Sequence, residues 1–382
     1  MTLINKHLIW LIVGGGLLGV SQQIAIVVLP LLAKVMAVSY ESLVNWQALG
    51  SLLFLFSSVF WAKAVAKHGI TWVVKVSTVG FLLSNLMLLC LWLNHQWLAT
   101  TMMLAIFIVS RVCHGVFSSG IVPQLQTSAL MLYPHNSVAA LAKVALGGTL
   151  ARCLTPLLCM GLLMFSATWV FALPIVLAMC VLWATPRLAK VQLPLNKARK
   201  VTQHRGLLVV ALLSAFCLCY GQFSLVHVFA RFIPDNSIAV SQWVAGNLAL
   251  TACLSSFNQL YYIKKRQMNA EKLLIASVAF ALLMAGVASL VNSLVAVCVC
   301  ISLLFMALNS ATLAYTNVIV AHTSSQFTNY ITLVHTLGYA LGALWINFSF
   351  AQPFAVICVA LSVVFAIIVT RYIRFAYLSQ CS

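Results

Sequence analysis

Two arginines, Arg111 and Arg152, lie near the middle of long apolar segments, where a charge has few partners. A basic residue at the centre of a bilayer-spanning helix costs about 2.5–3.5 kcal/mol, so a partner or a watery cavity must offset it. The three acidic residues of the sequence, Glu41, Asp235 and Glu271, fall at loops or at the ends of such segments. A guanidinium binds carboxylate or phosphate through a planar fork of donors. The arginines therefore predict a site for an anionic small molecule; the alternative is that each binds carbonyls or water where helices pack.

Other polar side chains recur three and four residues apart inside apolar segments, which places each set on one face of a helix. Two sets contain the arginines: Arg111, His114 and Ser118, and Gly148, Arg152 and Thr155. The remaining sets are Gln22 with Gln23; Tyr220, Ser224 and His227; Asn309, Thr312 and Thr316; and Thr332, His335 and Tyr339. We expect these side chains to line a substrate cavity, the alternative for each being a hydrogen bond that only supports the fold. Glycines are expected to let the two arginine-bearing helices approach closely.

Coupling to protons requires a group that gains and loses one, and no carboxylate is available at membrane depth. His114, His227 and His335 are the candidates, together with Arg111, because histidine titrates near neutral pH. A substrate carboxylate that carries the proton itself is an alternative. A lone histidine in a membrane helix is also commonly a packed hydrogen-bonding group.

The composition indicates the elements that position these residues. Of 382 residues, 63% are hydrophobic and 6% charged, with a mean hydropathy of +1.08, which excludes a water-soluble fold. Because a spanning helix takes about 20 apolar residues, the chain has room for roughly twelve and for no soluble catalytic domain. The apolar runs predict spans at 8–33, 42–64, 71–93, 98–122, 137–161, 167–185, 207–230, 240–262, 273–291, 294–318, 327–350 and 353–373. No Cys-x-x-Cys or Cys/His zinc spacing appears, so no metal or cofactor is expected.

The net charge of +18 is distributed over short loops, as expected for membrane topology rather than for nucleic-acid binding. With the N terminus in the cytoplasm, the outer loops hold Lys34 and Arg231. The inner loops and tails hold Lys6, Lys63, Lys67, Arg187, Lys190, Lys197, Arg199, Lys200, Arg205, Lys264, Lys265, Arg266, Lys272, Arg371 and Arg374. Both termini are therefore predicted to be cytoplasmic.

The longest polar stretch divides the chain into two sets of six spans. We predict an N-terminal bundle over 1–185, a basic linker over 186–206 and a C-terminal bundle over 207–382. Trp46 and Gly50 in the second span are echoed by Trp243 and Gly246 in the eighth, which favours a duplicated bundle.

Three segments carry a family resemblance. Residues 110–120, SRVCHGVFSSG, resemble the Arg-x-x-x-Gly signature of the fourth helix in the major facilitator superfamily. Residues 147–156, GGTLARCLTP, are similar to the glycine-rich fifth helix of its antiporters, with Thr155 in place of the glycine before Pro156. The loop over 61–69, WAKAVAKHG, resembles the superfamily's loop after helix two, but Ala66 replaces its acidic residue and the trailing basic pair is missing.

This resemblance implies the superfamily's all-α fold, and the two arginines resemble those of bacterial exporters of carboxylate-type siderophores. The function expected is proton-coupled export of a hydrophilic anion by alternating access, by a monomer spanning the bacterial inner membrane. Multidrug or antibiotic efflux and uptake of an organic anion or amino acid are the alternatives. The sequence has no acidic cluster of the kind that a membrane-embedded transferase needs. It also has no large extramembrane parts of the kind that a receptor or scaffold needs. No P-loop is present, so a gradient must supply the energy.

Overall fold

Helices account for all the regular structure in the described part of the chain. The computed structural model describes residues 3–132, 137–186, 205–234, 236–264, 270–322, 327–349 and 352–380. Its helices are α1 (Leu3–Met36), α2 (Tyr40–His68), α3 (Ile70–Asn94), α4 (Thr100–Ser118), α5 (Val122–Leu132), α6 (Ser137–Phe165), α7 (Ala167–Ala184), α8 (Arg205–Ala230), α9 (Ser237–Lys264), α10 (Ala270–Leu290), α11 (Leu294–His322), α12 (Phe327–Ser349) and α13 (Pro353–Gln380).

The predicted set of about twelve spans is confirmed. Eleven helices of the described residues are long and apolar enough to cross a membrane, and α12 contributes the shorter apolar stretch Leu333–Phe348. The helices α4 and α5 are separated by a turn of three residues and together form one apolar stretch, Thr100–Ala129. The largest boundary error is here, because the prediction ended this span at 122.

The chain separates into two compact units. The first consists of Met1–Leu195 with Asp235–Ala249, and the second of Asn196–Pro234 with Leu250–Ser382. The predicted linker over 186–206 lies almost wholly outside the described residues, so the predicted domain boundaries stay a prediction.

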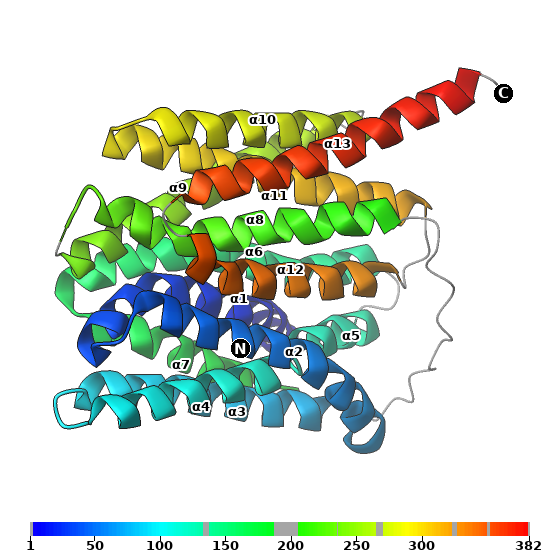
Figure 1. Cartoon of the computed structure of the whole chain (residues 1–382). Helices are drawn as coiled ribbons and strands as arrows, with labels where there is room; N and C mark the ends of the chain where they lie inside the picture. Colours follow the sequence, from blue (N-terminus) through cyan, green and yellow to red (C-terminus); the bar gives the residue numbers. More distant parts are fainter. Residues whose placement is uncertain are drawn as a thin grey trace. The chain divides into compact units, whose positions relative to one another are not determined.

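Both units use one internal packing plan. In the first, α1 packs on α6 and α7, and α3 packs on α4 and α7. In the second, α8 packs on α12 and α13, and α10 packs on α11 and α13; Figure 1 shows α8 beside α12 and α13 beside α10. The repeated pairing is that of two related helical bundles.

Glycine brings α1 and α6 into backbone contact in the first unit. A Cβ added to Gly147 would collide with the carbonyl of Ile12 and would lie 2.8 Å from the backbone nitrogen of Gly16. Small residues at such crossings allow close van der Waals packing, which stabilises helix pairs in a bilayer where water provides no hydrophobic driving force.

One expectation about these glycines is wrong. Gly147 faces α1, and the glycine of α4, Gly115, lies against the backbone of Gly50 in α2. A Cβ on Gly50 would in turn stand 3.0 Å from the carbonyl oxygen of Arg111. The close approaches therefore join α6 to α1 and α4 to α2, and the arginine-bearing helices α4 and α6 are held by different neighbours.

Candidate functional site

Arg111 is buried in the first unit, where α4 packs against α2 and α3. Only 2% of its surface is exposed. Its Nη1 donates to Oε1 of Gln47 on α2 at 3.1 Å, and its Nη2 donates to Oγ of Ser110 at 3.0 Å. The guanidinium also lies 5.7 Å from the centre of the Phe107 ring, within the range of a cation–π contact.

A short hydrogen-bond chain continues from this guanidinium to α3. Ser110 Oγ accepts from Arg111 and donates to the carbonyl oxygen of Ser84 at 2.9 Å. The Arg111 Nε is buried and has no hydrogen-bond partner among the described residues. All the acceptors that Arg111 does use are neutral, so its positive charge is not balanced locally.

The polar face of α4 continues from Arg111 along its contact with α3. His114 is 6% exposed, its ring centre lies 5.2 Å from that of Phe81, and its Nδ1 has no partner within the described part of the chain. Ser118 is buried one turn further on. The predicted stripe Arg111, His114 and Ser118 thus shares one buried face, in contact with another helix.

Arg152 has different surroundings on α6. Its side chain is exposed, and its Nε donates a long hydrogen bond of 3.4 Å to the carbonyl of Gly148 on its own helix. Among the described residues Arg152 and Arg111 share no hydrogen-bond partner. Of the two predicted glutamines of α1, Gln22 is exposed and Gln23 is buried. A cavity shared by the two arginines therefore stays a prediction.

In the second unit, α11 and α12 bring four of the polar residues together. Thr312 donates to the carbonyl of Leu308 at 3.0 Å and accepts from the hydroxyl of Tyr315 at 3.3 Å. That hydroxyl is also hydrogen-bonded to Nε2 of His335 on α12. The ring centre of Tyr339 lies 6.3 Å from that of His335. The predicted residues Thr312 and His335 thus meet at Tyr315, which is fully buried, and Tyr339 lies beside His335.

Asn309 belongs to a neighbouring contact between α9 and α11. Its Nδ2 donates to Oγ of Ser255 at 3.0 Å, and Asn258 of α9 donates to Ser310 of α11 at 2.5 Å. These two amide–hydroxyl bonds cross the helix pair one turn apart. Asn309 therefore serves helix packing in this structure, whatever else it does.

The predicted stripe on α8 is also built into packing. Tyr220 is fully buried with its ring stacked on that of Phe216, and Ser224 Oγ donates to the carbonyl of Tyr220 at 2.7 Å. His227 is half-buried one turn further.

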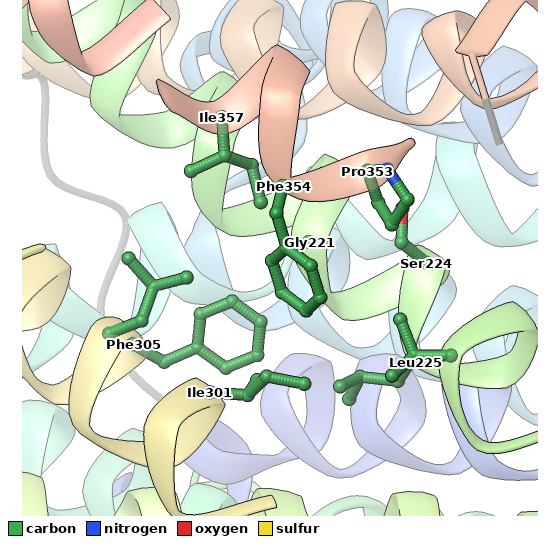
Figure 2. Close-up of a pocket in the computed structure, with 10 residues that line it drawn as sticks. Gly221, Ser224, Leu225, Ile301, Phe305, Pro353, Phe354 and Ile357 are labelled. Carbon is green, nitrogen blue, oxygen red and sulfur yellow. The ribbon is translucent and has the colours of Figure 1, made fainter. Parts of the chain in front are cut away.

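Figure 2 shows Ser224 at the edge of a small pocket between α8, α11 and α13, where the side chains of Phe305 and Phe354 converge. All the other residues that line this pocket are apolar or glycine: Gly221, Leu225, Val228, Ile301, Leu304, Phe305, Pro353, Phe354 and Ile357. The Ser224 hydroxyl is already bonded to its own helix, and no charged residue lines the pocket. The pocket is therefore unsuited to an anion.

Sequence reasoning missed three residues that contact the predicted site residues: Gln47, Ser110 and Tyr315. Tyr315 lies three residues after Thr312, so the helical spacing that identified Thr312 could also have identified it. Gln47 is 64 residues from Arg111 in the chain, and no pattern within one helix points to it. Within the described residues no group of three or more His, Cys, Asp or Glu side chains could hold a metal ion.

Comparison with sequence families identifies the family of this chain. The sequence model of the Major Facilitator Superfamily matches residues 11–343, and the chain belongs to this family. It is therefore a multi-pass membrane protein of a class of carriers that move small molecules across a lipid bilayer. A search of curated protein sequences finds no match.

Solved transporter structures share the fold over nearly the whole chain. A D-xylose-proton symporter has a TM-score of 0.72 at 11% identity, covering 95% of this chain and 97% of its own. A POT family transporter in complex with 5-aminolevulinic acid has a TM-score of 0.73 at 11% identity, covering 97% and 95%. A nucleoside transporter has a TM-score of 0.68 at 11% identity, covering 98% and 99%. Together with the family, this likeness supports secondary transport by the chain.

Proposed function

We propose that the protein is a proton-coupled exporter of a hydrophilic anionic metabolite, with carboxylate-type siderophores as the leading substrate class. It acts by alternating access, as a monomer in the bacterial inner membrane. The observation that carries this proposal is the buried guanidinium of Arg111, which is bound to neutral oxygens and whose Nε has no acceptor among the described residues.

The energetics of Arg111 favour an anionic ligand. Neutral acceptors solvate a guanidinium but do not cancel its charge, and burial weakens the screening that water would supply. An anion that reaches Arg111 gains a charge-assisted hydrogen bond, and such bonds are roughly twice as strong as neutral ones. Because Arg111 has no acidic partner among the described residues, its charge favours a carboxylate over a neutral or cationic solute.

Arg152 supports the same substrate class for a separate reason. It lies well inside the apolar stretch Lys143–Phe165, and its side chain is exposed. A guanidinium facing lipid at that depth is costly, so the exposed group is expected to face a water-filled path. Among the described residues Arg152 makes one long bond to its own helix, so its guanidinium can bind an anion that passes along this path.

His335 is the coupling group we favour among the four predicted. It is half-buried and hydrogen-bonded to the Tyr315 hydroxyl, which in turn reaches Thr312. A hydroxyl both donates and accepts, so this contact can be kept in either protonation state of the imidazole. His114, in contrast, is almost fully buried against Phe81 and has less access to exchangeable protons.

The test begins with finding the solute. Mass spectrometry of medium from wild-type and deletion cells identifies an anion that the deletion strain fails to release. Export of that anion is then measured for Arg111→Gln and Arg152→Gln, with Lys75→Gln as a charge-matched control because Lys75 is exposed on α3. We expect both arginine variants to lose export at normal protein levels and the control to retain it.

Unchanged export in both arginine variants would exclude the anion site. Accumulation of the anion inside wild-type cells, with none released, would show uptake instead of export.

A further inference from the structure

A second cavity in the C-terminal unit is lined by none of the candidate site residues described above. It lies at the ends of α8, α10, α11 and α13 that are expected to face the cytoplasm, and its volume of about 370 Å³ includes space open to solvent. Its wall is formed by buried or half-buried apolar side chains: Leu207, Val210, Leu274, Ile275, Val318, Ile367 and Ile368. Its polar lining residues, called the rim below, are Glu271, Arg371 and Tyr372.

The guanidinium at this rim is available for a ligand. Arg371 is half-buried, and within the described ranges no hydrogen bond or ion pair is made by its side chain. A cation held beside an apolar cavity without a protein partner favours an anionic group placed over an apolar body. Glu271 adds negative charge to the same rim, so a singly charged phosphodiester suits the rim better than free phosphate, whose charge approaches −2 at neutral pH.

The level of the rim along the helix indicates where such a ligand comes from. The span predicted from the sequence over 353–373 ends two residues after Arg371, so Arg371 is expected to lie at the level of the headgroup region. Arginine and tyrosine are both favoured at that level, because each has an apolar stem and a polar tip. The apolar wall of the cavity extends from there toward the hydrocarbon.

We propose that this cavity binds one phospholipid of the surrounding leaflet, with its phosphate on Arg371 and the start of an acyl chain against the apolar wall. Because this volume is partly open to the surroundings, we expect the pocket to hold the phosphate and the first methylenes of a chain, while the remaining chain stays in the bilayer. Substrate transport is a separate property, so this proposal stands or falls independently of the export proposal.

The experiment measures lipid binding to the purified full-length protein. Delipidated protein in detergent is titrated with phosphatidylglycerol, and bound lipid is counted by native mass spectrometry. Loss of one charge-assisted hydrogen bond predicts that Arg371→Gln weakens the first binding event about tenfold. Lys272→Gln is the matched control, since Lys272 is an exposed cation on the same end of α10 that does not line the cavity. We expect its affinity to stay within about twofold of wild type.

A second variant keeps the charge and removes the space. Ile367→Trp should fill the cavity and reduce lipid binding while Arg371 remains. Equal binding by Arg371→Gln and wild type, or an equal loss in Lys272→Gln, would overturn the proposal. Displacement of the lipid by millimolar inorganic phosphate would also overturn it, because it would show a site for free anions.

Discussion

Arg111 depends on neighbours that are individually unremarkable in the sequence. Gln47 supplies the acceptor for one of its terminal nitrogens across the contact between α2 and α4. We expect Gln47→Leu to lower the free energy of unfolding by about 1–3 kcal/mol, because it leaves a second guanidinium nitrogen, Nη1, without a partner among the described residues. Thermal unfolding in detergent checks this. Gln22→Leu, at an exposed position on α1, should change stability by no more than about 0.5 kcal/mol.

If Gln47→Leu unfolded at the same temperature as wild type, another acceptor would be satisfying Arg111. The hydrogen bonds drawn for the guanidinium would then need revision.

In the second unit, Tyr315 supports a predicted site residue as Gln47 does in the first. Its hydroxyl connects Thr312 with His335. Tyr315→Phe removes the hydroxyl and keeps the ring, so we expect a stability loss of about 1 kcal/mol. It should also alter the pH dependence of transport, since the imidazole loses the group that binds it. A double-mutant cycle with His335→Gln separates this contact from general damage. Additive effects in the cycle would show that the two side chains act independently.

Sequence reasoning found the residues whose chemistry is unusual for their surroundings and missed those whose chemistry is ordinary. A charge such as Arg111 inside an apolar run is costly, and that cost makes it visible without any structure. Placing the uncharged side chains of Gln47 and Tyr315 in an apolar run costs far less free energy, so they do not stand out in the sequence. Their importance comes from a partner on another helix, 64 residues away for Gln47 and 20 for Tyr315, and no periodicity within one helix encodes that partner.

At the scale of the helix, small residues determine which elements touch. Gly147 of α6 faces the backbone of α1, so Gly147→Ala must push the two helices apart or distort one of them. We expect this variant to lose most of its folded yield, assayed by size-exclusion chromatography in detergent. Gly161→Ala on the same helix is the matched control, because a Cβ there meets nothing within 4 Å. The control should be neutral or slightly stabilising, since alanine has the higher helix propensity.

Equal yields of the two glycine variants would contradict the close contact between α1 and α6. The expectation that α4 and α6 approach each other was wrong because a glycine does not identify the helix that packs against it. A glycine in an apolar run indicates that something approaches closely, but the rotation of the helix about its own axis decides what approaches. That rotation is set by tertiary packing, which is why Gly115 faces Gly50 of α2.

For the whole molecule, the number of spans decides on which sides of the membrane the termini lie. Hydropathy alone was sufficient for this count, because a run of about twenty apolar residues is typical of a helix that spans the membrane. The described residues nevertheless contain thirteen helical segments, and an odd number of crossings would place the termini on opposite sides. The question therefore depends on α4 and α5.

The turn between α4 and α5 favours a single crossing. Gly120 and Ile121 donate backbone hydrogen bonds to Phe117 and Ser118, which continues the chain from one helix into the next. With 11 residues, α5 is about 16 Å long, far short of the roughly 30 Å hydrocarbon core, so it cannot cross alone. The described helices then supply twelve crossings, and the excess of Lys and Arg on one set of loops predicts that both termini are cytoplasmic.

Reporter fusions test this topology. We expect green fluorescent protein fused after Ser382 to fluoresce and alkaline phosphatase at the same position to be inactive. The reverse is expected for insertions at Gln96, in the turn between α3 and α4, which supplies the internal control. Active phosphatase at both positions would mean that α4 and α5 cross separately or that another span is missing. The even count, and with it the assignment of the phospholipid cavity to the cytoplasmic leaflet, would then fail, because that cavity is bounded by helix ends whose side of the membrane is set by the same count.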